Sequence, residues 1–186
     1  MIQSVKPAPT DETDGLPMPK RIWAVISVGF ALCMSVLDVN IINIVLPTLS
    51  HDFGTSPAVT TWIINGYQLA IVVSLLSFSA LGEIIGYRKV YLSGIGLFCI
   101  TSLICALSDS FWTLTIARIF QGFSASAITS VNTAQLRYIY PKSQLGRGMG
   151  INAMVVAISA AAGPSVASGI LSIASWHWLV AHHHPP

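Results

Sequence analysis

Two ionisable side chains lie inside long apolar runs of this sequence, and they are the residues best suited to chemistry. Asp38 stands late in the run that begins at Ile22, and Arg118 stands early in the run that begins at Phe111. A charge within a membrane is costly and usually marks a functional site. If these runs cross a membrane in opposite directions as helices, Asp38 lies roughly 12 Å and Arg118 roughly 10 Å from the same surface.

Opposite charges at matched depth on two helices predict an ion pair or a shared proton site. Coulomb attraction grows as the dielectric constant falls, and an unpaired carboxyl group in such a medium favours its protonated form. A carboxyl group in this setting is able to take up and release a proton near neutral pH. The alternative is that both side chains extend to the outer interface of the membrane.

Amide side chains within the apolar runs are candidates for lining a cavity. Gln121 lies one helical turn from Arg118, Gln68 lies in the middle of the second run, and Asn43 lies late in the first. Amides inside a membrane usually face protein or a water-filled cavity, although many serve only as helix–helix contacts. We predict that Asn43, Gln68 and Gln121 line a cavity near the two charges.

A short segment rich in glycine and charge joins the second and third apolar runs. Gly82 and Gly86 permit a tight turn and close helix packing. Glu83 is able to pair with Arg88 and Lys89 across an interface that moves. An ordinary basic loop would have the same composition, so both interpretations stay open.

Gly163 and Pro164 interrupt the last apolar run. Proline removes a backbone hydrogen bond and kinks a helix, and the small residues around this pair allow close contact with a neighbouring helix. The segment therefore predicts a kinked packing face in the last helix.

The composition of the 186 residues excludes several classes of protein. Hydrophobic residues make up 53% and charged residues 9%, which is too little charge for a soluble domain. The basic residues form no stripe, so no nucleic-acid partner is expected. The three cysteines lack disulfide or zinc spacing, and no nucleophile–base set or nucleotide loop occurs. We therefore expect no metal, no cofactor and no enzymatic activity.

Lysine and arginine occur in alternate gaps between the apolar runs. This pattern predicts a multi-pass membrane protein with a cytoplasmic N-terminus. Pro47 and Pro57 are expected to stop helices in the first outer gap, and the short gap 108–110 predicts antiparallel packing of the third and fourth helices. The expected organisation is a disordered cytoplasmic tail over 1–21, an all-α bundle over 22–181 with spans at about 22–46, 59–81, 90–107, 111–134 and 149–173, and a His/Pro end over 182–186.

Five segments, in this order, resemble motifs of the major facilitator superfamily, and most closely its drug:proton antiporter branch with fourteen spans. They are Leu37–Pro47 (with Asn40 where threonine is usual), Trp62–Ala70, Ser79–Lys89, Arg118–Gly122, and Gly163–Pro164 (with Ala167 and Ser168 where glycines are usual). Trp176–Trp178 is similar to the Trp-Arg-Trp that ends the fifth helix of that branch.

The resemblance implies a partial N-terminal bundle of the major facilitator fold and a role for each motif. Asp38 and Arg118 would take part in proton coupling, and Gly163 with Pro164 would keep the fifth helix kinked and limit proton leak. The loop residues Gly82, Glu83, Gly86, Arg88 and Lys89 would gate the conformational change. The implied partners are the lipid bilayer, protons and a small amphipathic substrate, exported as a cationic toxic compound across a bacterial inner membrane.

The family continues into a sixth helix and a second half, whereas this sequence turns into a His/Pro end after its fifth apolar run. We therefore expect a truncated transporter that needs a C-terminal half for function. One alternative is a remnant that transports nothing and at most associates with other membrane proteins. A weaker alternative is half of a symporter for a metabolite or sugar, against which the Gly163–Pro164 motif argues.

Overall fold

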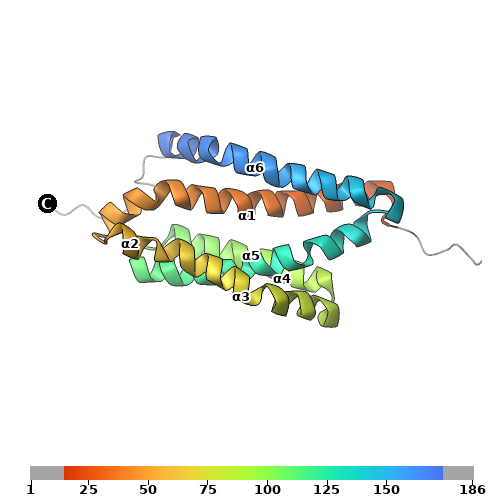
Figure 1. Cartoon of the computed structure of the whole chain (residues 1–186), viewed down its shortest axis with the longest axis horizontal. Helices are drawn as coiled ribbons and strands as arrows, with labels where there is room; N and C mark the ends of the chain where they lie inside the picture. The colour runs from red at the N-terminus through yellow and green to blue at the C-terminus, as the bar shows by residue number, and fades with distance from the viewer. Residues whose placement is uncertain (1–14, 174–186) are drawn as a thin grey trace, which may run out of the picture.

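The computed structural model describes residues 15–173, and within them the chain is a bundle of long helices (Figure 1). Each of the five apolar runs corresponds to one long helix. In chain order the helices are α1 (Met18–Asp52), the single turn α2 (Pro57–Thr60), α3 (Trp62–Ile85), α4 (Tyr87–Ala106), α5 (Phe111–Ile139), the 3₁₀ turn η1 (Lys142–Gln144) and α6 (Leu145–Ile173).

Four of the long helical segments in the described part are long and apolar enough to cross a membrane, and α5 is the exception. Polar residues at spaced positions along α5, among them Arg118, Gln121 and Asn132, lower its hydropathy. These residues are buried, because α5 packs between α3 and α4 and is the most enclosed helix of the bundle. The helix that is least apolar is thus shielded by its neighbours, as expected for polar groups at membrane depth.

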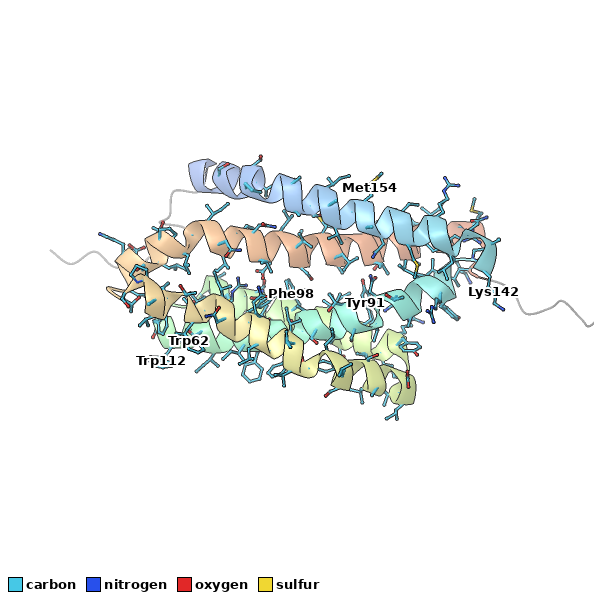
Figure 2. The ribbon with its side chains drawn as sticks, viewed as in Figure 1. Trp62, Tyr91, Phe98, Trp112, Lys142 and Met154 are labelled. Carbon is cyan, nitrogen blue, oxygen red and sulfur yellow. The ribbon has the colours of Figure 1, made fainter. Side chains whose placement is uncertain are left out.

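The helices fall into two groups. Helices α1 and α6 run side by side, and α5 packs against both α3 and α4 (Figure 1). The predicted antiparallel packing of α4 and α5 across the short gap 108–110 is confirmed. Trp62 and Trp112 stand at one end of the bundle and Lys142 at the other (Figure 2).

Two hydrophobic clusters join α1 to the α3–α5 group. Near the basic end, Val28 and Leu32 of α1 pack with Val90, Ile128 and other residues of α4 and α5. Near the opposite end, Val45 and Leu49 of α1 pack with Ile63 of α3 and Leu114 of α5. Between these clusters lies the stretch of α1 that contains Asp38.

The ends of α1 differ from the prediction at both sides. Residues 18–21, which the hydropathy pattern predicts in the tail, are helical. Pro17 occupies the N-cap position, and Pro19 lies in the first turn, where proline is well tolerated. Pro47 does not stop the helix, which continues to Asp52. Proline within a membrane helix is tolerated where neighbouring groups satisfy the freed carbonyl, so the expectation about Pro47 was wrong. Pro57 instead starts α2.

Candidate functional site

The centre of the site is an ion pair between α1 and α5. Nη1 of Arg118 donates to Oδ2 of Asp38 at 2.6 Å. The Arg118 side chain is 2% exposed and the Asp38 side chain 19% exposed. The expected pairing of these two residues is thus present, and the carboxylate is its more accessible member.

Gln121 completes the ion pair on the α5 side. Its Oε1 accepts from Nη1 of Arg118 at 2.7 Å, and its Nε2 donates to Oδ1 of Asp38 at 3.2 Å and to Oγ of Ser102 at 3.0 Å. Arg118 and Gln121 are three residues apart, which places both on one face of α5. The amide therefore holds the carboxylate and the guanidinium at once, and its orientation is set by the charges on either side.

Three members of this network were not predicted. Ser102 and Cys105 come from one face of α4, and the Cys105 thiol donates to Oε1 of Gln121 at 3.6 Å. The ring of Tyr67, from α3, lies under the guanidinium of Arg118 with 5.2 Å between the ring centroid and Cζ. The sequence shows that Ser102 and Cys105 share a helix face, but it contains no signal for which face of α4 turns toward α5.

One donor of the site has no partner. Nε of Arg118 is buried and forms no hydrogen bond within the described residues. An unsatisfied buried donor on a charged group is costly, and such groups are rare in native proteins. Both side-chain hydrogen bonds of the guanidinium thus come from Nη1, to Asp38 and Gln121, and the Tyr67 ring adds a contact to its face.

The chemistry available here is reversible charge neutralisation. Guanidinium stays protonated in proteins, so Asp38 is the member of the pair that is able to change its charge. The apolar clusters on either side of the pair exclude water and lower the local dielectric constant, which strengthens the attraction between the two charges. Protonation of Asp38 would remove the charge that holds α1 to α5 and leave Arg118 with Gln121 and the ring of Tyr67.

Glycines set the helix spacing around the pair. A Cβ atom at Gly122 would lie 2.5 Å from the carbonyl oxygen of Tyr67, so only glycine lets α5 approach α3 at this level. At Gly163 a Cβ atom would lie 2.7 Å from Cβ of Asn40, two residues from Asp38. The Arg118–Gly122 motif thus combines a charge, a bridging amide and a close contact within five residues. Pro164 follows Gly163 on an exposed part of α6.

Two predicted cavity residues lie away from this network. Asn43 is exposed, and its amide donates to the carbonyl of Val39 in its own helix at 2.9 Å. Gln68 is exposed on α3. Of the three amides predicted to line a cavity, the structure brings only Gln121 to the ion pair.

The predicted gating residues form a tight joint between α3 and α4. Gly86 links the two helices with a φ of 98°, a value that favours glycine. A Cβ atom at Gly82 would lie 2.8 Å from the ring of Tyr87, which explains the second glycine. Glu83, Arg88 and Lys89 are exposed, and no ion pair among them occurs in the described part of the chain.

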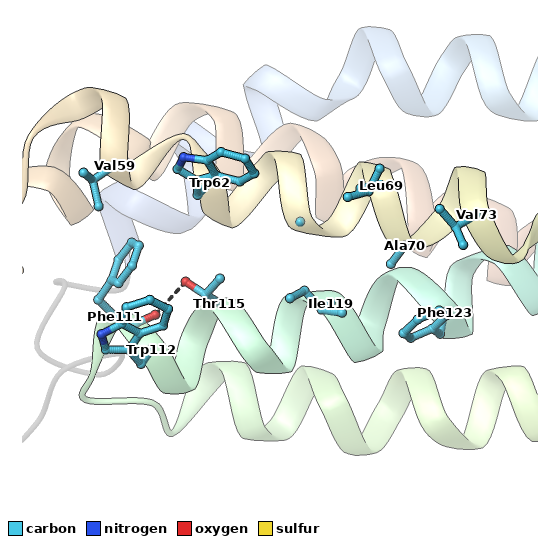
Figure 3. Close-up of a pocket in the computed structure, with 11 residues that line it drawn as sticks. Val59, Trp62, Leu69, Ala70, Val73, Phe111, Trp112, Thr115, Ile119 and Phe123 are labelled. Carbon is cyan, nitrogen blue, oxygen red and sulfur yellow. Dashed lines mark hydrogen bonds between the residues drawn. The ribbon is translucent and has the colours of Figure 1, made fainter.

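An apolar pocket of about 640 Å³ lies between α3 and α5 (Figure 3). Trp62 and Trp112 line the part of the pocket nearest the end of the bundle, and Ile119 and Phe123 line it farther along α5. Its lining residue Ile119 follows Arg118 directly in the chain, but no residue of α1 or α6 lines it. Among residues 15–173 no cluster of side chains is arranged to hold a metal ion. The segment Trp176–Trp178 and the His/Pro end lie outside the described residues.

Comparison with known proteins identifies the family. Among curated proteins, the chain is 53% identical to the uncharacterized transporter YebQ of Escherichia coli K12 over 92% of its own length and 37% of YebQ. It is 32% identical to the riboflavin transporter RibZ of Clostridioides difficile over 84% of its own length and 35% of RibZ. It is 31% identical to the tetracenomycin C resistance and export protein of Streptomyces glaucescens over 92% of its own length and 32% of that protein.

The chain thus spans about a third of the length of the curated relatives it matches. Residues 28–181 match the family description of the Major Facilitator Superfamily. This match covers all the long helices from early α1 onward, and with them the Asp38–Arg118 pair. The chain is a multi-pass membrane protein and belongs to the major facilitator superfamily.

Proposed function

We propose that this chain forms the N-terminal helix bundle of a proton-coupled exporter in the inner membrane of a bacterium. The observation that carries the proposal is the ion pair of Asp38 and Arg118, in which the carboxylate is 19% exposed and the guanidinium only 2%. A carboxylate that is accessible, paired and enclosed above and below by apolar residues is suited to exchange its counter-charge for a proton.

The proposed cycle uses one carboxylate in two states. In the first state Asp38 is charged and paired with Arg118. Nη1 of Arg118 and the Gln121 amide then hold α1 against α5. Uptake of a proton neutralises Asp38 and frees α1 to shift relative to α5. Gly163, in contact with Asn40 of α1, would transmit that shift to α6, and the joint at Gly86 would let the ends of α3 and α4 follow.

A cationic, amphipathic substrate fits this arrangement best. The charge of such a compound is able to replace a proton or Arg118 beside Asp38, and its apolar part suits cavities such as the one between α3 and α5. Because the chain spans about a third of its relatives' length, the remainder of the cavity is expected from a second bundle, against which this bundle would rock. The export function in the name of the tetracenomycin C relative supports this direction of transport.

The test is a chimera in which this chain replaces the 171-residue segment of YebQ that it matches. Everted vesicles from cells that lack other exporters are energised by respiration, and ethidium is added while a pH-sensitive dye reports proton release. We expect ethidium to release protons from vesicles with the chimera. Asp38→Asn should reduce the signal to that of vesicles without the chimera.

Asp52→Asn is the matched control, because Asp52 lies on the same helix but is exposed and, among the described residues, pairs only with His51. It should leave the ethidium response unchanged. Loss of the response in both variants, or in neither, would contradict the role assigned to Asp38. The 186-residue chain alone should give no response; transport by it that depends on Arg118 would show that a second bundle is not needed.

A second candidate function is uptake or release of a neutral metabolite, and the similarity to RibZ favours it. In this case Asp38 would couple to protons while the amides and aromatic rings near it bind the substrate. Riboflavin in place of ethidium in the same vesicles distinguishes the two. A riboflavin response without an ethidium response would replace the exporter proposal. The absence of a proton signal with both compounds would favour the alternative that the chain is a remnant without transport activity.

A further inference from the structure

A second hollow, of about 990 Å³, opens at the basic end of the bundle, at the opposite end from the apolar pocket. It is bounded by the first turns of α1, the joint between α3 and α4, the first turns of α4 and the last turns of α5. We call it the basic groove and define it by six of its lining residues: Lys20, Arg88, Tyr91, Leu92, Gln135 and Arg137. The ion pair lies outside it, and the proposed transport cycle shares with it only the joint at Gly86.

The groove concentrates positive charge that the described residues do not neutralise. Lys20, Arg88 and Arg137 all line it, and none of them forms an ion pair or side-chain hydrogen bond within residues 15–173. Lys20 and Arg88 also lie in the first turns of α1 and α4, where the helix dipole is positive and no acidic residue is present. Cations at helix N-termini repel the dipole, so this arrangement favours a bound anion.

An unsatisfied donor lies beside the groove, on its lining residue Gln135. Nε2 of Gln135 is buried and has no hydrogen-bond partner among the described residues. The first helical turn of α4 offers further donors, because it has no side-chain cap. A ligand with several acceptor oxygens would satisfy these groups together.

The walls of the groove are apolar. Tyr91 and Val28 form the inner wall and are buried, and Leu92 is 55% exposed on the outer face of α4. Lipid tails are as apolar as leucine, so an acyl chain is able to pack along this exposed side chain. The ligand must therefore combine an anionic head with an apolar body, and it must reach the site from the bilayer.

We propose that the basic groove binds the phosphate head of an anionic phospholipid, with an acyl chain along Leu92. Basic pockets between membrane helices at the basic side of a protein suit such headgroups, and three cations match a lipid with one or two phosphates. The inference is independent of the transport proposal, because the binding is measured on the chain itself.

The experiment is native mass spectrometry of the purified 186-residue chain, released from micelles that contain phosphatidylethanolamine with either phosphatidylglycerol or cardiolipin. We expect the chain to retain the anionic lipid preferentially. Arg88→Gln with Arg137→Gln should lower its retention at least tenfold. Both arginines are exposed, so this variant should fold as the parent does.

Arg147→Gln is the control, because Arg147 is exposed at the same end of the bundle but lies on α6, outside the groove. It should change retention less than twofold, as should added inorganic phosphate. An equal loss of lipid retention with Arg147→Gln would show that retention depends on overall surface charge, and it would overturn the proposal. Displacement of the lipid by inorganic phosphate would overturn the assignment to a lipid and indicate a site for free phosphate.

Discussion

Arg118 is suited to its position by more than its charge. A single nitrogen, Nη1, reaches both Oδ2 of Asp38 and Oε1 of Gln121, and the planar guanidinium lies over the ring of Tyr67. Lysine has a more strongly hydrated charge and lacks the planar guanidinium, so it would lose the stacking on Tyr67. The site therefore favours arginine specifically, and Arg118→Lys is not a conservative change here.

The stability of the bundle should depend on keeping the two charges together. Removing one member of a buried ion pair leaves the other uncompensated, at a cost of about 3–5 kcal/mol. We expect Arg118→Leu to lower the melting temperature of the detergent-solubilised chain strongly. Asp38→Asn combined with Arg118→Gln should be less destabilising than the sum of the two single changes, because it leaves no charge behind.

A thiol-reactive fluorescent dye that reports exposure of the half-buried Cys33 and Cys105 on heating would measure these melting temperatures, with the exposed Cys99 as a constant background. Additive effects of the two single changes would mean that the charges do not interact. This outcome would also weaken the proposed cycle, which relies on their interaction.

The predictability of the site differs from residue to residue for physical reasons. Depth along a helix follows from counting residues, so the meeting of Asp38 and Arg118 could be predicted. Rotation about the helix axis does not follow from hydropathy when several faces are apolar, so Ser102, Cys105 and Tyr67 could not. The same uncertainty explains the expectation that Asn43 and Gln68 would line a cavity with Gln121.

At the scale of elements, α5 shows how a polar helix is accommodated. It carries the arginine, the bridging glutamine and several buried hydroxyl groups, and it is enclosed by α3 and α4. Small residues along it, such as Gly122 and Ala127, let the neighbouring backbones approach. Dispersion contacts and hydrogen bonds between helices stabilise this core, because lipid tails are as apolar as the side chains they would replace.

Gly122→Ala should separate α5 from α3. A Cβ atom there would lie 2.5 Å from a backbone oxygen, which cannot move without displacing α3. We expect a loss of about 1–3 kcal/mol from this overpacking. Gly96→Ala on α4 is the matched control, since nothing lies within 4 Å of its added methyl group.

The same melting assay applies to both glycine variants. Gly96→Ala should be neutral or slightly stabilising, because alanine is the better helix former. Equal melting temperatures for the two variants would mean that α3 and α5 are less closely packed than the distances indicate.

The helix boundaries show what hydropathy leaves out. The apolar run of α1 begins at Ile22, whereas the helix begins at Met18. The first turn contains basic residues, and a search for apolar residues therefore misses it. Similarly, α5 continues past its apolar run to Ile139 with Arg137 in its last turn, where a cation interacts favourably with the helix dipole. Membrane helices extend into the interface, and their polar ends are missed by a search for apolar residues.

At the scale of the whole molecule, the two ends of the bundle have different chemistry. Trp62, Trp112 and an apolar pocket occupy one end, and most of the arginines and lysines occupy the other. The positive-inside rule predicts that the basic end, with the N-terminal segment, faces the cytoplasm.

Single cysteines would test this orientation once Cys33, Cys99 and Cys105 are replaced by serine. We expect His51→Cys, whose native side chain is 91% exposed, to react with a membrane-impermeant maleimide in intact spheroplasts. Ser143→Cys, exposed in η1, should react only after the membrane is permeabilised. The reverse labelling pattern would mean that the bundle is inserted the other way.

The pairing of α1 with late helices has a consequence for biogenesis. Asp38 and its partner Arg118 are 80 residues apart, and the contact of Arg21 with Gln144 near the start of α6 spans 123 residues. At a synthesis rate of about 5–20 residues per second, α1 waits roughly 4–16 s for α5 to leave the ribosome. During that interval the carboxyl group of Asp38 has no guanidinium beside it. A nascent chain stalled before Arg118 would present a lone acidic residue within its first helix, where an unpaired charge is costly. We expect membrane quality control to degrade such a chain.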